Sequence, residues 1–199
     1  MPKRNAKDAA QTRADIITEA QALFARKGYA ATSAREISAA AGVTVGAMFH
    51  HFDSKMHLFE CIFEKLELEL DNRARAASNP LLGLGPLETF LAGVRQSLDF
   101  AERSDFHRIV FVEGPAVFGE DKWREIDARL GLKTVMKGTQ ALMSAGIIAE
   151  RPIKPVAILL MGTMNSAGFA IARGEEGIDK NSLVDALRAL LGGHHSGRE

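Results

Sequence analysis

The sequence predicts an all-α protein, and three observations support this fold class. Almost every apolar pattern repeats at steps of three and four residues, which is the spacing of one helix face. No segment shows the alternation that is typical of a strand. Of the 199 residues 46% are hydrophobic, and 25 Lys and Arg balance 25 Asp and Glu, which favours a sizeable buried core over intrinsic disorder.

The first two expected helices carry clear end signals. An amphipathic helix is expected over 12–27, and Gly28 follows two basic residues as a helix C-cap does. The next helix starts at Ser33, because Glu36 three residues later completes a capping-box pattern. We therefore expect a short, well-defined turn between these two helices.

Two further helices follow directly. The second helix stops at Gly42, and Thr44 can cap a third helix that ends near Phe52. Asp53 or Ser54 can cap a long fourth helix, whose apolar residues again recur at steps of three and four. These residues are Met56, Phe59, Phe63, Leu66 and Leu70.

Loop-forming residues separate this region from a helical body. Pro and Gly clusters occur over 78–80 and 83–86. Helical runs are then expected near 87–103, 105–113, 121–145, 155–173 and 181–191. The sequence predicts two domains, an N-terminal helix-turn-helix domain over 1–55 and a helical domain over 56–199.

Residues 155–172 contain no charge and could form a membrane span, which needs about 20 predominantly apolar residues. Thr163, Asn165 and Ser166 lie at the centre of this stretch, so a buried helix explains it better than a membrane span. We therefore expect no membrane partner. The single cysteine, Cys61, cannot form an internal disulfide, which fits a reducing compartment. With no secretory signal at the N-terminus, we expect a cytoplasmic protein.

The balanced net charge hides an uneven distribution. Residues 1–55 hold eight Lys and Arg against five Asp and Glu, a net charge of +3, which leaves 17 against 20 and a net charge of −3 for 56–199. A basic module on an acidic body is a common footprint of DNA binding, although by itself it is weak evidence.

Residues 32–52 predict a helix-turn-helix, whose second helix can enter the major groove of DNA. Gly46 lies inside that short second helix, where glycine destabilises by roughly 0.5–1 kcal/mol relative to alanine. Its presence indicates that something approaches the backbone closely. Thr44, Val45 and Ala47 are also small and leave room for base edges and thymine methyl groups.

Lys55 and two histidines are candidates for phosphate contacts. Lys55 lies in the first turn of the fourth helix, where the helix dipole disfavours a cation. A phosphate group at this helix N-terminus would face both the dipole and the lysine. His50 and His51 can donate hydrogen bonds to phosphates or bases. At this stage two ordinary helices of a bundle remain the alternative.

Several short stretches extend the pattern. They are Ala22-Leu23-Phe24, Gly28-Tyr29-Ala30-Ala31-Thr32, Ile37-Ser38, Ala41-Gly42-Val43, Gly46-Ala47-Met48-Phe49-His50-His51-Phe52, Ser54-Lys55 and Leu58-Phe59. With these features the run from Ala14 to Phe63 resembles the N-terminal domain of the tetracycline-repressor (TetR) family of bacterial transcription regulators. The rest of the chain resembles the family only in its helical layout.

The resemblance implies that the N-terminal domain binds duplex DNA through one set of residues. This set is Thr32, Ser33, Arg35, Thr44, Val45, Gly46, Ala47, Phe49, His50, His51 and Lys55. Two positions depart from the family pattern. Phe49 stands where relatives usually have a tyrosine whose hydroxyl binds phosphate, and Val45 stands where they often have a polar residue. The operator sequence therefore stays open.

The resemblance also implies a homodimer formed by the last two long helices and a pocket for a small effector. Candidate lining residues are Phe90, Val94, Phe111, Trp123, Met136, Met143 and Met164, with Arg108, Glu113, Gln140 and Asn165 to orient a ligand. Each of these also fits an ordinary core or surface position. We expect a repressor that a small, largely apolar effector releases from a palindromic operator, since two-fold symmetry doubles the bases read.

Two other classes of protein are alternatives. An architectural DNA-binding protein without an effector fits the same residues. An enzyme would need His50, His51 and His57 as metal ligands or Cys61 as a nucleophile, but two adjacent histidines on a helix chelate poorly. No metalloprotease motif, paired-cysteine site or glycine-rich phosphate loop is present. The sequence therefore predicts no catalytic site, no metal and no cofactor.

Overall fold

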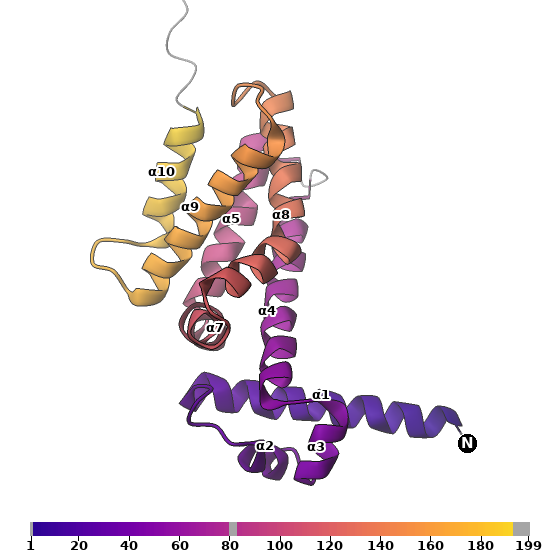
Figure 1. Ribbon diagram of the computed structural model, residues 1–199. Coiled ribbons are helices and arrows are strands. Elements are labelled where there is room, and N and C mark those ends of the chain that lie inside the picture. Colours follow the sequence, from indigo (N-terminus) through magenta and orange to yellow (C-terminus); the bar gives the residue numbers. More distant parts are fainter. Residues whose placement is uncertain (1, 80–82, 193–199) are drawn as a thin grey trace, which may run out of the picture. The chain divides into compact units, whose positions relative to one another are not determined.

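The computed structural model describes residues 2–79 and 83–192, with side chains from residue 7 onward, and these residues form helices and connecting turns without a strand (Figure 1). The chain divides into two compact units. The N-terminal unit comprises Met1–Leu66 and Ser104–Trp123, and the C-terminal unit comprises Glu67–Arg103 and Arg124–Glu199. The helix-turn-helix unit thus takes in a segment, Ser104–Trp123, that the sequence-based division assigned to the body.

The N-terminal unit is built from helices that lie in two separate stretches of the chain. They are α1 (Pro2–Lys27), α2 (Ala34–Ala40), α3 (Val45–His51), the first half of α4 (Lys55–Ala77), α6 (Ser104–Phe106), the π-helix η2 (His107–Glu113) and α7 (Gly114–Phe118). Helix α1 begins well before residue 12, where the sequence predicted its start. Pro2 occupies the first helical turn, where the missing N–H of proline loses no hydrogen bond.

The predicted capping box is confirmed at the start of α2. The hydroxyl of Ser33 accepts a hydrogen bond from the backbone N–H of Glu36, and the Glu36 carboxylate accepts one from the N–H of Ser33. Lys27 at the end of α1 also donates to Glu36, at 2.5 Å. These hydrogen bonds, that of Lys27 foremost, lower the pKa of Glu36 to about 2. The carboxylate therefore stays charged and fixes the turn between α1 and α2.

An aromatic cluster fills the interior of the N-terminal unit. The ring of Phe59 on α4 lies 5.4 Å from that of Phe24, 5.2 Å from Tyr29 and 5.3 Å from Phe118. Phe63 lies 5.3 Å from Phe118 in an edge-to-face arrangement. Such ring pairs stabilise beyond the area that they bury, so the cluster joins α1 and α4 to the segment that ends in α7.

Gly114 lies close to two aromatic side chains of the N-terminal unit. A Cβ at this position would lie 2.8 Å from the Phe63 ring and 2.9 Å from Trp123, so only glycine fits without a shift. Trp123 is buried and donates its indole N–H to the carbonyl of Val110 at 2.9 Å. Residues 104–123 are therefore packed into the N-terminal unit through several buried side chains.

The C-terminal unit is a helical bundle (Figure 1). Its elements are the second half of α4, α5 (Pro86–Glu102), α8 (Glu120–Ser144) from residue 124 on, α9 (Ile153–Arg173) and α10 (Lys180–Gly192). Both α9 and α10 pack on α5. The main buried cluster consists of Phe90, Leu91, Val94, Leu98, Leu142, Val184, Leu187 and Leu191.

Helix α9 covers the uncharged stretch 155–172. By length and composition it is the one helix among the described residues that could cross a membrane, with a mean hydropathy of 1.5. Its inward face buries Ala157, Met161 and Gly168. Its outward face leaves Ile158 and Leu159 exposed, so in one chain only 22% of its apolar window is buried.

Two buried carboxyl groups and a half-buried one lie near each other in the C-terminal unit. Glu67 and Asp127 are both buried, and Asp71 accepts a hydrogen bond from the hydroxyl of Thr134 at 2.5 Å. Burial raises the pKa of Glu67 well above its usual value, and the neighbouring Asp127 and Asp71 raise it further. Burial also raises the pKa of Asp127 to about 6, against a hydrogen bond from Asn165 that lowers it. The ionised forms of Glu67 and Asp127 are therefore disfavoured in the folded chain.

Glu67→Gln should stabilise the protein, by an amount that grows with pH. Below pH ~4.3 the glutamate is protonated in the folded and the unfolded chain, so the two proteins should differ little. As the pH rises toward the raised pKa of the folded state, Glu67 ionises freely only in the unfolded wild-type chain. The free energy of unfolding of the wild type therefore falls by up to ~1.4 kcal/mol per pH unit. Unfolding in urea at pH 4 to 8 measures the difference.

Glu125→Gln is the matched control, since Glu125 is an exposed carboxylate of α8. It should leave the stability of the protein nearly unchanged across this pH range. A Glu67→Gln protein that is less stable than wild type at pH 8 would contradict the conclusion that ionisation of Glu67 destabilises the folded chain.

Candidate DNA-binding interface and effector cavity

Helix α3 has one buried face and one open face. Met48, and Phe52 directly after the helix, are fully buried and fix α3 in the N-terminal unit. The hydroxyl of Thr44 accepts a hydrogen bond from the N–H of Ala47 at 3.1 Å and caps the helix start. The opposite face leaves Val45 39% and Phe49 43% exposed. This face of α3 is therefore open to solvent.

The turn before α3 is held by backbone hydrogen bonds. Gly42 adopts a φ of +66°, a left-handed conformation that favours glycine after a helix. The N–H of Val43 donates to the carbonyl of Ser38 at 2.9 Å, and the buried Ser38 hydroxyl donates to the carbonyl of Ala34. The backbone conformation of Gly42 and these hydrogen bonds thus fix the angle between α2 and α3. Figure 1 shows both short helices beside α1.

Most of the predicted DNA-binding residues are exposed or half-buried residues of α2, α3 and the residues that cap them. Those of the α2 segment, Ser33 and Arg35, are exposed. The exposed residues of the α3 segment are Thr44, Val45, Gly46, Phe49 and His50, while Ala47 and His51 are half-buried. A Cβ at Gly46 would meet only the Thr44 hydroxyl, at 3.9 Å, so the backbone of α3 is open at this point.

Two predicted contact residues have other roles in the structure. Thr32 is only 1% exposed, and its hydroxyl donates to the carbonyl of Gly28 at 2.8 Å. The Lys55 ammonium donates to the carbonyls of Tyr29 and Thr32, both at 2.9 Å, and lies 4.1 Å from the centre of the Tyr29 ring. The prediction that Lys55 contacts a phosphate stays a prediction, and in the structure its charge holds the loop between α1 and α2.

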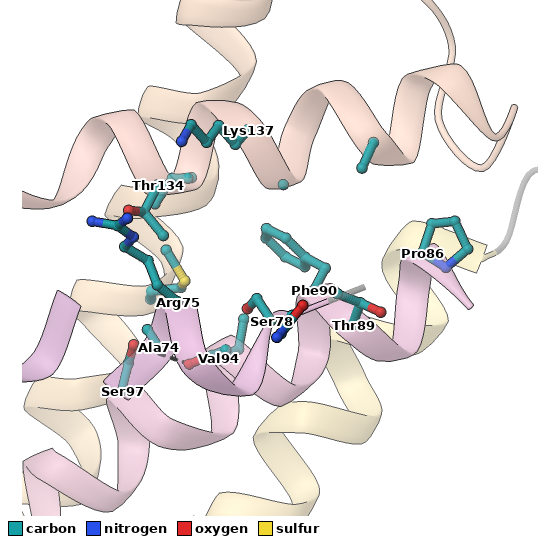
Figure 2. Close-up of a pocket in the computed structure, with 16 residues that line it drawn as sticks. Ala74, Arg75, Ser78, Pro86, Thr89, Phe90, Val94, Ser97, Thr134 and Lys137 are labelled. Carbon is teal, nitrogen blue, oxygen red and sulfur yellow. Dashed lines mark hydrogen bonds between the residues drawn. The ribbon is translucent and has the colours of Figure 1, made fainter. Parts of the chain in front are cut away.

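A cavity of about 380 Å³ lies within the C-terminal unit (Figure 2). Phe90, Val94 and Met164, all predicted from the sequence, line it. The lining residues that the sequence did not indicate are Ala74, Arg75, Ser78, Asn79, Pro86, Thr89, Gly93, Ser97, Thr134, Val135, Lys137, Gly138 and Ala141. In Figure 2, Arg75 and Thr134 lie together at one end of the cavity and Pro86 lies at the other. The volume and mixed lining suit a small organic molecule.

Four predicted effector contacts lie in the N-terminal unit, outside this cavity. Arg108 and Glu113 form an ion pair at 3.0 Å across η2, and a Cβ on Gly28 would lie 2.3 Å from the Glu113 carboxylate. Phe111 packs on Phe106 with ring centres 5.7 Å apart, and Trp123 is buried as described above. For these residues the sequence pattern of aromatic and paired polar groups reflects the packing of the N-terminal unit.

The remaining candidates do not line this cavity, and two of them, Gln140 and Met143, line a second pocket together with Glu150, Arg151 and Ile153. Met136 packs against the buried cluster of Val135, Ala157 and Met161. Gln140 is exposed, and Met143 is buried. Asn165 follows the lining residue Met164 in the chain and donates to the Asp127 carboxylate at 2.5 Å. The sequence missed the lining residues of α4 because their small and polar side chains give no periodic signal.

Two family models match the chain. The model described as "Bacterial regulatory proteins, tetR family" matches residues 16–62, and the model "Tetracyclin repressor-like, C-terminal domain" matches residues 87–194, more than half of the chain. The first covers α2 and α3, and the second covers most of the C-terminal unit. Both domains are thus recognised independently.

Curated relatives agree with the family models. The chain is 36% identical over 128 residues to the HTH-type transcriptional regulator AcrR of Shigella flexneri, which is 59% of this chain and 58% of AcrR. It is 37% identical over 79 residues to the regulator TtgR of Pseudomonas putida, which is 40% of this chain and 38% of TtgR. The chain therefore spans less than two thirds of the length of these relatives.

A solved structure extends the likeness to nearly the full length of the chain. It is a TetR-family transcriptional regulator from Pectobacterium atrosepticum, 29% identical, with a TM-score of 0.76 over 97% of this chain and 98% of that one. TetR-family regulators bind DNA, act as dimers and are not enzymes. The two family models, the open face of α3 and this likeness together show that the chain belongs to the TetR family of transcription regulators.

Proposed function

We propose that this regulator is a repressor that a small effector releases from a palindromic operator. The observation that carries the DNA-binding part is the open face of α3, with its small residues and its half-exposed Phe49. That face has the size and composition of a recognition helix, which reads base edges in the major groove. A protein with this role acts in the cytoplasm, where the DNA of a bacterium lies.

Capture of genomic fragments by the purified protein, followed by sequencing, tests this proposal. We expect a small number of sites with two-fold symmetry, whose half-sites lie about one helical turn apart. Binding spread evenly over the genome would instead favour the alternative, an architectural DNA-binding protein without an effector. The genes beside the captured sites would indicate which compounds to try as effectors.

The second part of the proposal is a homodimer through α9 and α10. One chain leaves an apolar strip along these helices, with Leu159 71% and Leu190 72% exposed. Ile158 is also exposed, and small residues such as Gly162 continue the strip along α9. A second copy is the occupant that we propose, because members of the family act as dimers and two α9–α10 pairs can form a four-helix bundle.

The cavity of the C-terminal unit is the proposed effector site. Its apolar wall includes Phe90, Val94 and Val135, and polar groups such as Ser97 and Thr134 lie among them. Pockets of this size with a few polar groups bind drug-sized ligands. Release of DNA by a bound effector requires that the effector and the operator weaken each other's binding by the same factor, typically 5–150-fold.

Gly46→Ala should make the protein more stable and its DNA binding weaker. Alanine is favoured over glycine within a helix by about 0.5–1 kcal/mol, and no atom other than the Thr44 hydroxyl lies within 4 Å of the new methyl group. On DNA the same methyl group would stand between the helix backbone and the groove. Thermal unfolding and operator titration measure the two effects. Unchanged operator affinity would remove Gly46 from the contact surface.

Lys55→Met should lower the stability of the protein and its affinity for every DNA sequence. The methionine keeps the apolar stem but leaves the carbonyls of Tyr29 and Thr32 without their donor, a loss of about 1–3 kcal/mol. Because the ammonium closes a loop, the slope of log affinity against log salt should stay as in wild type. A slope that falls by ~0.9 would restore Lys55 as a phosphate contact.

Leu159→Glu should convert the dimer to a monomer, since it places a charge in the centre of the proposed apolar contact. Light scattering after size exclusion, at micromolar protein, measures the mass. The control is Lys154→Glu, an exposed residue of the first turn of α9, which should remain a dimer. A wild-type protein that runs as a monomer near 21.6 kDa would contradict the dimer itself.

A further inference from the structure

Val45 and Phe49 form an apolar pair on the open face of α3. They are four residues apart, so their side chains are neighbours on one side of the helix. Their exposed fractions are 39% and 43%. Of the residues between them, Gly46 is exposed and has no side chain, Ala47 is half-buried, and Met48 is buried. The apolar pair is therefore open to a partner that approaches this side of α3.

Helix α3 and its cap lack the side chains that recognise guanine, adenine or cytosine by paired hydrogen bonds. In the major groove Arg and Lys bind guanine, Asn and Gln bind adenine, and Asp and Glu accept from cytosine. None of these six residue types occurs from Thr44 to His51. The Thr44 hydroxyl accepts a hydrogen bond from the N–H of Ala47, and His50 lies about 100° around the helix from Phe49. The side of α3 that carries the apolar pair can therefore offer little but apolar contact.

The thymine methyl group is the apolar feature of the major groove. Among the base edges presented there, only that of thymine adds a methyl group to its hydrogen-bonding atoms. An apolar side chain gains by covering this methyl group, whereas it leaves the polar atoms of another base without a partner. Neighbouring Cβ atoms on a helix lie about 5–6 Å apart, and successive base pairs lie about 3.4 Å apart. The apolar pair can thus reach methyl groups that are one or two base steps apart.

We propose that Val45 and Phe49 determine the sequence preference of this regulator by packing against thymine methyl groups in each half-site of the operator. This inference rests on the proposed function in that α3 is the helix that enters the major groove. DNA is the partner of this face because TetR-family regulators bind DNA and the N-terminal family model covers α3. A Cβ at Gly46 would meet only the Thr44 hydroxyl, at 3.9 Å, so bases can approach the helix closely beside the apolar pair.

Arg35 is the opposing candidate for base recognition, since its exposed guanidinium has the chemistry to bind guanine. It belongs to α2, the first helix of the helix-turn-helix. In this motif the first helix crosses the sugar-phosphate backbone and the second contacts the base edges. We therefore assign Arg35 to phosphate contacts, which position the protein and carry no sequence information.

Replacement of thymine by uracil tests the proposal, because the two bases differ only in the methyl group. The duplexes that the purified protein binds most tightly are first selected from a random DNA library. Each thymine of the selected half-site is then replaced by uracil in both half-sites, and affinity is measured by fluorescence anisotropy at one salt concentration. A buried methyl group corresponds to about fourfold in affinity, so loss of one contacted methyl from both half-sites should weaken binding about 15-fold.

Val45→Ala and Phe49→Ala identify which side chain covers which methyl group. Each variant should bind the thymine duplex at least fourfold more weakly than wild type, and should lose little more when uracil replaces the thymine that its side chain covers. A variant that merely folded poorly would weaken binding of thymine and uracil duplexes by the same factor. The matched control is Val112→Ala, a 44% exposed valine of η2 in the same unit, which should keep the affinity and the thymine preference of wild type.

Three results would overturn the proposal while leaving a sequence-specific regulator in place. They are selected half-sites without thymine, uracil duplexes that bind as tightly as thymine duplexes, and a preference for guanine that Arg35→Ala abolishes. A selection that yields no preferred sequence would refute the operator of the proposed function, and this inference with it. The failure of the thymine contacts and the failure of the proposed function are therefore distinguishable.

Discussion

The aromatic cluster around Phe59 is the contact on which the DNA-binding unit depends. It joins α1, through Phe24, to α4, and its ring contact with Phe118 draws the segment 104–123 into the same unit. Because aromatic rings interlock in few arrangements, movement of one element requires repacking of the others. The surface offered by α3 therefore rests on a core to which distant parts of the sequence contribute.

The loop between α1 and α2 shows how that core sets the contact surface. Lys55 reaches across to the carbonyls of Tyr29 and Thr32, while the capping box at Ser33 fixes the start of α2. A cation in the first turn of α4 is unfavourable for the helix itself. The two carbonyls offset this, so the fold of the unit gives Lys55 a structural role.

The C-terminal unit contains the opposite situation, a local arrangement that its own packing does not explain. Glu67 and Asp127 are buried, and burial disfavours their ionised forms in the folded chain. Natural proteins depart from such rules mostly where function requires it.

The sequence by itself determined the fold class, the helix-turn-helix and the family. These features depend on local signals, such as the capping box that begins at Ser33, the glycine turn at Gly42 and the helical period of the apolar residues, and local signals survive in a linear pattern. The exposed face of α3 followed from the same signals, because a short helix with one apolar side buries only that side.

Only the tertiary structure decided the cavity, the role of Lys55 and the place of residues 104–123. Each depends on side chains far apart in sequence, as in the hydrogen bond between Thr134 and Asp71. Aromatic and methionine side chains have the same helical spacing in a core and in a pocket, so Trp123 could not be placed from its neighbours in the chain. Glu67 gave no signal either, since a glutamate on a helix is ordinary until packing removes its water.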